Sequence, residues 1–254
     1  MRRVKTAKKV FHTLLDREVE LEASLKFKVY VFNPDSSKKA LVVHGWMSKS
    51  IYMTKIIQKL ILNDYMVVAV DLPGHGASPA RRVSWKDSVK ALLKVQEHFN
   101  GFDLALGHSY GGAMILNATG IAHEVSDIEE ILKLKNIVMI ASPVKIQTAI
   151  NLFAKKMGLS EYEGDKLISK IEEESGTTVD KLDGVYLQKT YPTDTKIHCI
   201  HDVNDKIIPF EDASYLQELG DSVSLSRVRN LGHISVIYDS KAMGKLNEHL
   251  LSIS

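Results

Sequence analysis

Hydrophobic residues in this chain occur in short runs that alternate with segments of helical period. Two strands with alternating polar and apolar residues are expected between Glu18 and Phe32, and a turn-rich stretch, residues 33–37, follows them. Short segments rich in apolar residues predict six further strands, at residues 40–43, 66–70, 103–107, 137–141, 196–200 and 223–228. Strands that alternate with helices are typical of a mostly parallel sheet covered by helices on both faces.

Amphipathic segments predict helices between and after the strands. Ser84 opens one of them with the Ser-x-x-acid pattern of an N-cap, and Asn100 with Gly101 is expected to end it. Gly220 is placed to stop another helix, which begins near Phe210. The predicted helical ranges are 51–62, 85–100, 113–122, 210–219 and 235–251.

Residues 144–190 interrupt this alternation, because two helical patterns follow each other there without a strand signal. Their apolar faces are Ile150, Phe153, Ala154 and Met157 in one helix and Leu167, Ile168 and Ile171 in the other. We predict a helical cap at 144–190, inserted into a core formed by residues 1–143 and 191–254. A pair of ordinary crossover helices is the alternative.

The near-neutral charge balance excludes a function that depends on strong electrostatic attraction to a partner. The 254 residues carry 33 basic and 31 acidic side chains, a formal charge of +2 with neutral histidines. We expect no nucleic-acid partner, because the chain offers no groove-length basic patch. With 44% hydrophobic residues, the composition is that of a globular protein whose length favours one large α/β domain. A core of this size needs no disulfide or metal.

Three features bear on where the protein resides. Every apolar run is shorter than the about 20 residues that span a bilayer, so no integral membrane segment is expected. The single cysteine, Cys199, cannot form an internal disulfide, which suits a reducing cytoplasm. The basic residues at positions 2–9 precede the first acid, Asp16, as in a targeting segment or the solvated start of a first element. Because no apolar signal-peptide core follows them, we expect a cytoplasmic protein.

Residues 107–111, Gly-His-Ser-Tyr-Gly, match the pattern Gly-x-Ser-x-Gly between a predicted strand and a predicted helix. The bare pattern arises by chance in roughly one chain of this length in ten, so its placement carries the argument. A sharp strand-to-helix turn strains its middle residue, and flanking glycines relieve the crowding around it. We therefore predict that Ser109 exposes its hydroxyl as a nucleophile.

A serine hydroxyl is a weak nucleophile at neutral pH and requires a base, which in turn requires an orienting acid. Two aspartates, Asp202 and Asp205, follow the strand predicted at 196–200, and His233 follows the last strand. Asp205 precedes His233 by 233 minus 205, or 28 residues, which is enough chain for one helix and one strand. The acid and base that Ser109 requires are therefore present downstream.

In four motifs the chain resembles the α/β-hydrolase superfamily, over about residues 25–250. Beside the serine motif and the order Ser, Asp, His, residues 41–46 (Leu-Val-Val-His-Gly-Trp) look like the family's strand followed by His-Gly-x. Residues 71–78 (Asp-Leu-Pro-Gly-His-Gly-Ala-Ser) look like its Asp-x-Pro-Gly-His-Gly-x-Ser loop. The resemblance implies an α/β-hydrolase fold, with a mostly parallel eight-stranded sheet flanked by helices and a small helical cap.

Carried over position by position, the resemblance also implies roles for individual residues. Ser109 is the nucleophile, His233 the general base and then acid, and Asp205 the orienting carboxylate. The backbone N–H groups of Trp46 and Tyr110 form the oxyanion hole.

The acid loop departs from the family's usual pattern, His-Gly-x-x-Asp-x-x-Val/Ile-Pro. Asp202 replaces the glycine, whereas Asp205, Ile208 and Pro209 keep the register, so Asp205 is favoured over Asp202 as the acid. The extra carboxylate of Asp202 is expected either to raise the pKa of the histidine or to point to solvent.

Abundant histidines raise the alternative of a metal site. Its ligands would come from His44, His75, His108, His198, His201 and His233, with Asp202 and Asp205. We expect no metal, because residues 198 and 201 lie on opposite faces of a strand and no His-Glu-x-x-His spacing occurs. His44, His75 and His108 each sit beside a glycine in a motif, where they are expected to brace loops by hydrogen bonding. No nucleotide-binding motif is present, and no cofactor is expected.

Together these features predict a serine hydrolase that cleaves small-molecule carboxylic esters, with small to medium acyl chains, through an acyl-enzyme. His44, His108, Phe153 and Met157 are expected to line the substrate pocket. A thioesterase, an amidase and a C–C bond hydrolase use the same machinery, and a non-enzymatic ligand-binding protein uses the same fold. These alternatives stay open, and the sequence assigns no oligomeric state.

Overall fold

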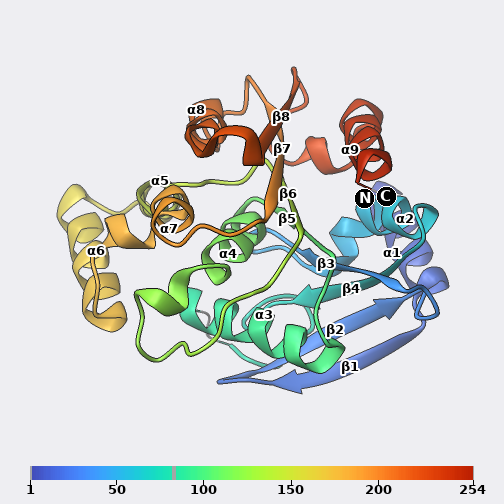
Figure 1. The fold of residues 1–254 in the computed structure, drawn as a ribbon, viewed down its shortest axis with the longest axis horizontal. Helices are drawn as coiled ribbons and strands as arrows, with labels where there is room; N and C mark the ends of the chain where they lie inside the picture. The colour runs from blue at the N-terminus through green and yellow to red at the C-terminus, as the bar shows by residue number, and fades with distance from the viewer. Residues whose placement is uncertain (1, 82–83, 254) are drawn as a thin grey trace.

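The computed structural model describes residues 2–81 and 84–253, and within these ranges the chain forms one sheet of eight strands (Figure 1). The strands are β1 (Arg17–Glu22), β2 (Lys26–Phe32), β3 (Lys38–Val43), β4 (Tyr65–Asp71), β5 (Leu104–His108), β6 (Asn136–Ile140), β7 (Lys196–Asp202) and β8 (Val223–Val228). They lie in the order β1-β2-β4-β3-β5-β6-β7-β8. β2 is antiparallel to β1 and β4, and every other pair is parallel. The predicted mostly parallel, eight-stranded sheet is therefore confirmed.

Helices cover both faces of this sheet (Figure 1). The α-helices are α1 (Arg2–Leu14), α2 (Thr54–Leu62), α3 (Trp85–Phe99), α4 (Tyr110–Ala118), α5 (Ile146–Met157), α6 (Glu161–Ser175), α7 (Gly184–Thr190), α8 (Phe210–Tyr215) and α9 (Ser240–Ser252). Short 3-10 segments are η1 (Ser50–Met53), η2 (Ile121–His123), η3 (Val179–Leu182), η4 (Leu216–Ser222) and η5 (Ser235–Ile237). The α3 helix begins and ends as the sequence predicts, because the Ser84 side chain accepts from the Asp87 N–H and Asn100 adopts a left-handed conformation.

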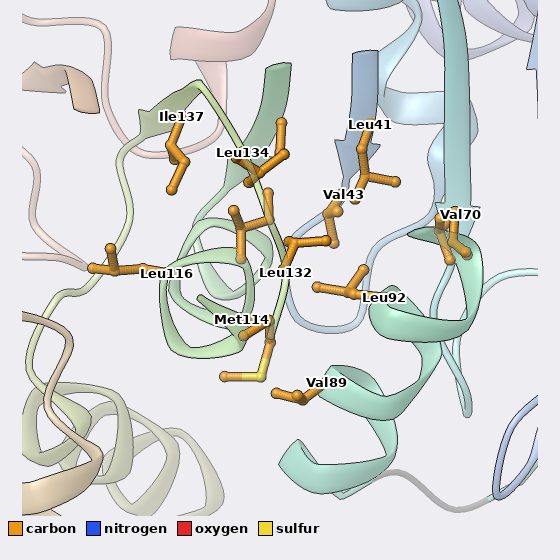
Figure 2. Packing of buried hydrophobic residues seen from close by; sticks show 14 of the residues in the cluster. Leu41, Val43, Val70, Val89, Leu92, Met114, Leu116, Leu132, Leu134 and Ile137 are labelled. Carbon is orange, nitrogen blue, oxygen red and sulfur yellow. The ribbon is translucent and has the colours of Figure 1, made fainter. Parts of the chain in front are cut away.

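Central strands are apolar on both faces because each face packs against helices. All seven residues of β4 are buried, with Val68 and Val70 in one hydrophobic cluster and Val67 and Ala69 in the other. The first cluster also contains residues of α3, α4 and α7, and the second contains residues of α1, α2 and α9. Figure 2 shows where α3 and α4 meet β3 and β4 through Leu41, Val43, Val70, Val89, Leu92 and Met114.

Two predicted helices at the C-terminal end of the chain are wrong in their extent. The range 235–251 contains the short η5, after which α9 begins at Ser240, because the Asp239 carboxylate accepts from the Lys241 N–H and starts a new helix. The range 210–219 is α-helical only to Tyr215 and continues as 3-10 helix, with Gly220 at a φ of 70°.

Helix α1 was not among the predicted elements. Its residue Phe11 is buried against the rings of Tyr30 and Phe32, at centroid distances of 5.2 and 5.0 Å. The side chains of Arg2, Arg3 and Lys5 lie outside what the structure describes. None of the helices in the described ranges has both the length and the apolar composition of a membrane span.

Residues 144–190 form α5, α6, η3 and α7, and no strand occurs among the described residues of this segment. The first two helices extend away from one end of the sheet (Figure 1). Helix α7 instead belongs to the layer that covers the sheet, because Val185 and Leu187 are fully buried in the first hydrophobic cluster. The division into a core and a cap at these boundaries remains a prediction.

Candidate active site

Ser109 lies at the turn between β5 and α4, in the strained conformation expected of it. Its φ and ψ are 53° and −125°, and α4 begins at the next residue. Close packing explains the adjacent glycine: a Cβ on Gly111 would lie 2.4 Å from the carbonyl oxygen of Val43. The absence of a side chain there lets α4 approach β3, and the approach places Ser109 above the carboxyl end of the sheet.

His233 is brought to Ser109 by the loop that follows β8. Its Nε2 lies 3.0 Å from Ser109 Oγ, and its Nδ1 lies 2.9 Å from Asp205 Oδ2. A carboxylate only accepts hydrogen bonds, so Nδ1 carries the proton of the neutral ring and Nε2 accepts from the serine hydroxyl. The three residues, which are far apart in the chain, thus form one chain of hydrogen bonds.

Asp205 is held as a carboxylate beside this histidine. Its side chain has no exposed surface, and Oδ1 accepts from the backbone N–H groups of Ile207 and Ile208. Burial by itself raises the pKa of Asp205, but the hydrogen bonds from His233 and the two N–H groups outweigh burial and leave the pKa below its usual value. The carboxylate therefore stays charged at neutral pH.

The sequence suggested that Asp202 would either act on the histidine or point to solvent, and the structure places it in neither position. It is fully buried rather than solvent-exposed, and it contacts backbone rather than the imidazole of His233. Its oxygens accept from the backbone N–H groups of Asn204, Asn230, Leu231 and Gly232 at 2.5–3.1 Å. Burial raises the pKa of Asp202, but these four donors together lower it. Asp202 thus anchors the loop that carries the histidine.

Trp46 and Tyr110, whose backbone N–H groups are predicted to form the oxyanion hole, belong to segments that meet at Ser109. Tyr110 is the first residue of α4, whose N–H has no acceptor within the helix. The turn that carries Trp46 touches the serine, since a Cβ on Gly45 would lie 3.2 Å from Ser109 Cβ. The Trp46 and Tyr110 rings also meet edge to face, with centroids 5.2 Å apart. Both N–H groups are thus candidates to stabilise negative charge that develops next to Ser109.

A cavity of about 1310 Å³ opens onto Ser109 and His233. One wall is the face of α4 that carries Tyr110, Ala113, Met114 and Asn117. Helices α5 and α6 supply much of the opposite wall, and the Phe153 ring of α5 meets the Trp46 ring edge to face at 5.8 Å. The predominance of apolar side chains fits an organic ligand.

Of the four residues predicted to line the pocket, the structure brings His108 and Phe153 to the cavity and leaves His44 and Met157 outside it. His44 is fully buried, accepts from the Leu72 N–H at Nε2 and donates from Nδ1 to the Gly45 carbonyl. His44 thus braces two loops by hydrogen bonding, which the sequence analysis also expected of it. Met157 lies at the end of α5 with 58% of its surface exposed.

Leu25 and Trp85 are among the lining residues that sequence reasoning missed. Leu25, in the turn between β1 and β2, and Trp85, at the start of α3, both line the cavity. The sequence offers no local signal for either, because a leucine in a turn and a tryptophan in a first helical turn are equally typical of ordinary packing.

The histidines do not gather into a metal site. Within residues 2–81 and 84–253, no three His, Cys, Asp or Glu side chains are arranged to hold a metal ion. His198 stacks on His249 at 4.1 Å, whereas His201 donates to the Ile208 carbonyl on the opposite face of β7. Burial lowers the pKa of His198 to about 4, so its ring is neutral at neutral pH.

Comparison with known protein families identifies the family of this chain. A model described as the Alpha/beta hydrolase family matches residues 40–167, half of the chain, and this range includes Ser109, Trp46 and Tyr110. The chain belongs to the alpha/beta hydrolase family. A comparison with curated proteins found no match.

Solved structures of the same fold include an esterase, the protein Est1E and a thioesterase domain. The Pyrococcus furiosus esterase Pf2001 has a TM-score of 0.69 at 18% identity, over 96% of this chain and 94% of its own. Est1E from Butyrivibrio proteoclasticus has a TM-score of 0.69 at 13% identity, over 94% and 99%. A thioesterase domain from the curacin biosynthetic pathway has a TM-score of 0.63 at 15% identity, over 93% and 99%. Identities this low establish a shared fold.

Proposed function

We propose that this alpha/beta hydrolase is a serine hydrolase that forms an acyl-enzyme. The observation that carries the proposal is the pair of contacts made by His233, 3.0 Å from Ser109 Oγ and 2.9 Å from Asp205 Oδ2. These distances are those of a nucleophile, a base and an orienting acid in hydrogen-bond contact.

The proposed reaction has two stages. In the first, Ser109 Oγ attacks the substrate carbonyl carbon while its proton passes to His233 Nε2, and the N–H groups of Trp46 and Tyr110 stabilise the oxyanion. His233 then gives the proton to the departing alkoxide, which leaves as an alcohol and leaves an ester on Ser109. In the second stage His233 takes a proton from water, the hydroxide attacks the acyl carbonyl, and Ser109 leaves with the proton. Asp205 keeps its charge throughout and stabilises the imidazolium.

We propose a carboxylic ester as the substrate. The cavity is predominantly apolar, and its volume of about 1310 Å³ exceeds the roughly 300–1000 Å³ of ordinary ligand pockets. A small acyl chain leaves most of this space unfilled, so we extend the range inferred from the sequence, small to medium chains, to longer ones. The Pyrococcus furiosus esterase of similar fold supports this substrate class.

Thioesters, amides and C–C bonds are cleaved by the same arrangement of groups, and one structure of similar fold is a thioesterase domain. A panel of p-nitrophenyl esters of graded acyl length, with acyl thioesters and anilides beside it, separates these reactions. We expect the esters to give the highest kcat/KM, because an aryl oxide leaves with the least assistance. A higher kcat/KM for thioesters reassigns the substrate class without changing the roles of the residues.

Covalent labelling by a fluorophosphonate probe tests the proposed nucleophile directly. We expect the wild-type protein to be labelled and Ser109→Ala not to be. Ser50→Ala is the matched control, because Ser50 is a buried serine that does not line the cavity and whose Oγ has no hydrogen-bond partner among the described residues. Labelling that persists in Ser109→Ala removes this serine from the proposed role, and a wild-type protein that is neither labelled nor active on the panel favours a ligand-binding protein.

A further inference from the structure

His108 is a buried histidine that the proposed reaction does not use. It is the last residue of β5 and directly precedes Ser109, and only 3% of its surface is exposed. Its ring lies 5.0 Å from the His233 ring, measured between centroids. A titratable side chain buried this close to the nucleophile requires an explanation of what it contributes.

The hydrogen bond of the His108 ring defines its tautomer. Nε2 lies 2.9 Å from the backbone carbonyl oxygen of His233, and a carbonyl oxygen only accepts, so Nε2 carries a proton. Burial is the main reason that the pKa of His108 is lowered to about 3, and the positive charge that His233 acquires lowers it further. The ring is therefore neutral and donates from Nε2 alone, which leaves Nδ1 without a proton.

The surroundings of His108 keep its ring in one place. A Cβ on Gly45 would lie 3.2 Å from Nδ1, so the backbone of Gly45 packs directly against the ring. Nδ1 is buried and has no hydrogen-bond partner among the described residues. The titratable groups that act on the ring are His233, Asp205 and His44. None of these three side chains replaces the His233 carbonyl as the acceptor of the His108 Nε2–H.

The loop that carries His233 is held from two directions. On the β7 side, Asp202 accepts from the N–H groups of Leu231 and Gly232, and Asp205 accepts from the His233 ring. On the β5 side, the contacts come from two adjacent residues: His108 bonds the His233 backbone, and Ser109 bonds its ring. Two strands, β6 and β7, separate β5 from β8 in the sheet, so strand pairing alone does not tie this loop to the nucleophile.

We propose that His108 is a positioning residue, whose Nε2–H holds the backbone carbonyl of His233 and thereby sets the distance between the base and Ser109. This proposal rests on the proposed function. The last residue of β5 and the residue after it hold one histidine at its backbone and its ring, so a shift of the base loop relative to β5 is resisted at two points. Proton transfer from serine requires this distance to be kept within a few tenths of an ångström, and a misplacement of about 1 Å lowers rates by roughly 100-fold.

Three substitutions of His108 test whether the donor at Nε2 matters. In His108→Gln the side-chain amide nitrogen takes about the place of Nε2, in His108→Asn the shorter amide reaches only the place of Nδ1, and in His108→Leu no donor remains. We expect kcat for an aryl ester to fall by roughly 10- to 100-fold in the Leu and Asn variants, with KM changed by less than about threefold. We expect His108→Gln to recover most of the lost kcat.

Equal kcat in the Gln and Asn variants overturns the proposal, because donor position then has no effect. Wild-type kcat in His108→Leu overturns it as well. Thermal unfolding identifies any variant that fails to fold, and the comparison then uses the two amide variants, which are polar and similar in size.

A measurement on the wild-type protein keeps the proposal testable without any variant. The ¹⁵N chemical shifts of the His108 ring should report a neutral Nε2–H tautomer from pH 8 down to below pH 5. A ring that titrates near pH 6.5, or that carries its proton on Nδ1, overturns the proposed hydrogen bond. Failure of the proposed function shows separately, as a wild-type protein that neither reacts with a fluorophosphonate nor cleaves an ester.

Discussion

The Ser109 hydroxyl is unreactive by itself at neutral pH, and its environment supplies the reactivity we propose. A backbone φ of 53° directs Oγ toward His233, which lies 124 residues away in the chain. The carboxylate of Asp205 orients the imidazole from the other side. Each of the three side chains is therefore useful only while the other two are in place.

This interdependence predicts strongly non-additive losses of turnover. Ser109→Ala and His233→Ala should each lower kcat by at least about 10³-fold, and the double variant should lose little more than either single one. Steady-state kinetics with a p-nitrophenyl ester measure the three values, with Ser50→Ala as the control. Losses that multiply in the double variant contradict a shared step.

Substitutions of Asp202, which ends β7, and of Asp205, which follows it, are expected to differ in their effects on activity and stability. Asp205→Asn should lower kcat by roughly 10³-fold or more, because the amide presents the wrong hydrogen-bond partner to the His233 Nδ1–H. Asp202→Asn should lower kcat far less but destabilise the fold by about 2–3 kcal/mol, because its buried charge accepts four backbone N–H groups. Kinetics and urea unfolding of both variants test this, and the reverse ranking of kcat reassigns the acid.

At the scale of elements, the turn into α4 depends on the close approach of two backbones, in addition to its backbone hydrogen bonds. Gly111 sits against the backbone of β3, where a Cβ would lie 2.4 and 2.5 Å from the carbonyl oxygens of Val43 and His44. Carbonyl groups in a central strand have little freedom to move aside. The first turn of α4, and with it the Tyr110 N–H, is therefore placed by direct contact between backbones.

This contact predicts opposite effects for two Gly-to-Ala substitutions in helices. Gly111→Ala should destabilise the protein by about 2–3 kcal/mol and lower kcat, because α4 has to move away from β3. Gly164→Ala, in α6, should stabilise it by about 0.5–1 kcal/mol, because a Cβ there meets no described atom within 4 Å. Urea unfolding measures both, and a destabilised Gly164→Ala contradicts the helix geometry described for α6.

Across the whole molecule, six of the ten histidines are buried enough for their pKa values to be lowered. Burial is the largest cause in each case, and the pKa is about 4 for His44 and His198 and about 3 for His108. In the unfolded chain these rings have pKa values near 6.5. Below pH 6.5 the unfolded state therefore binds more protons than the folded state.

This difference predicts that acid destabilises the protein well above the range in which carboxylates titrate. The contribution of the neutral histidines is complete above pH 6.5 and is lost as the pH falls toward about 4. We expect the free energy of unfolding to fall by roughly 3 to 5 kcal/mol between pH 6.5 and 5, measured in urea. His198→Gln should reduce this fall, because burial lowers the pKa of His198 to about 4. A free energy that stays level over this range contradicts the prediction.

The sequence by itself determined the fold class and the eight strands. Apolar periodicity and the motifs that follow the strands are local properties, readable from a few neighbouring residues. The family match over residues 40–167 covers three of these motifs, at 41–46, 71–78 and 107–111. The sequence also proposed Ser109, Asp205 and His233, because their order and spacing follow from strands that end at one edge of a sheet.

Only the tertiary structure decided how the residues at that edge divide their tasks. It placed Asp202 against loop backbone and Asp205 against the imidazole, although Asp202 ends β7 and Asp205 lies only three residues farther on. It also put Leu25 and Trp85 in the cavity wall and joined His108 to the His233 carbonyl. Such contacts form between segments that are distant in the chain and meet only when the sheet is packed, so no local pattern of residues records them.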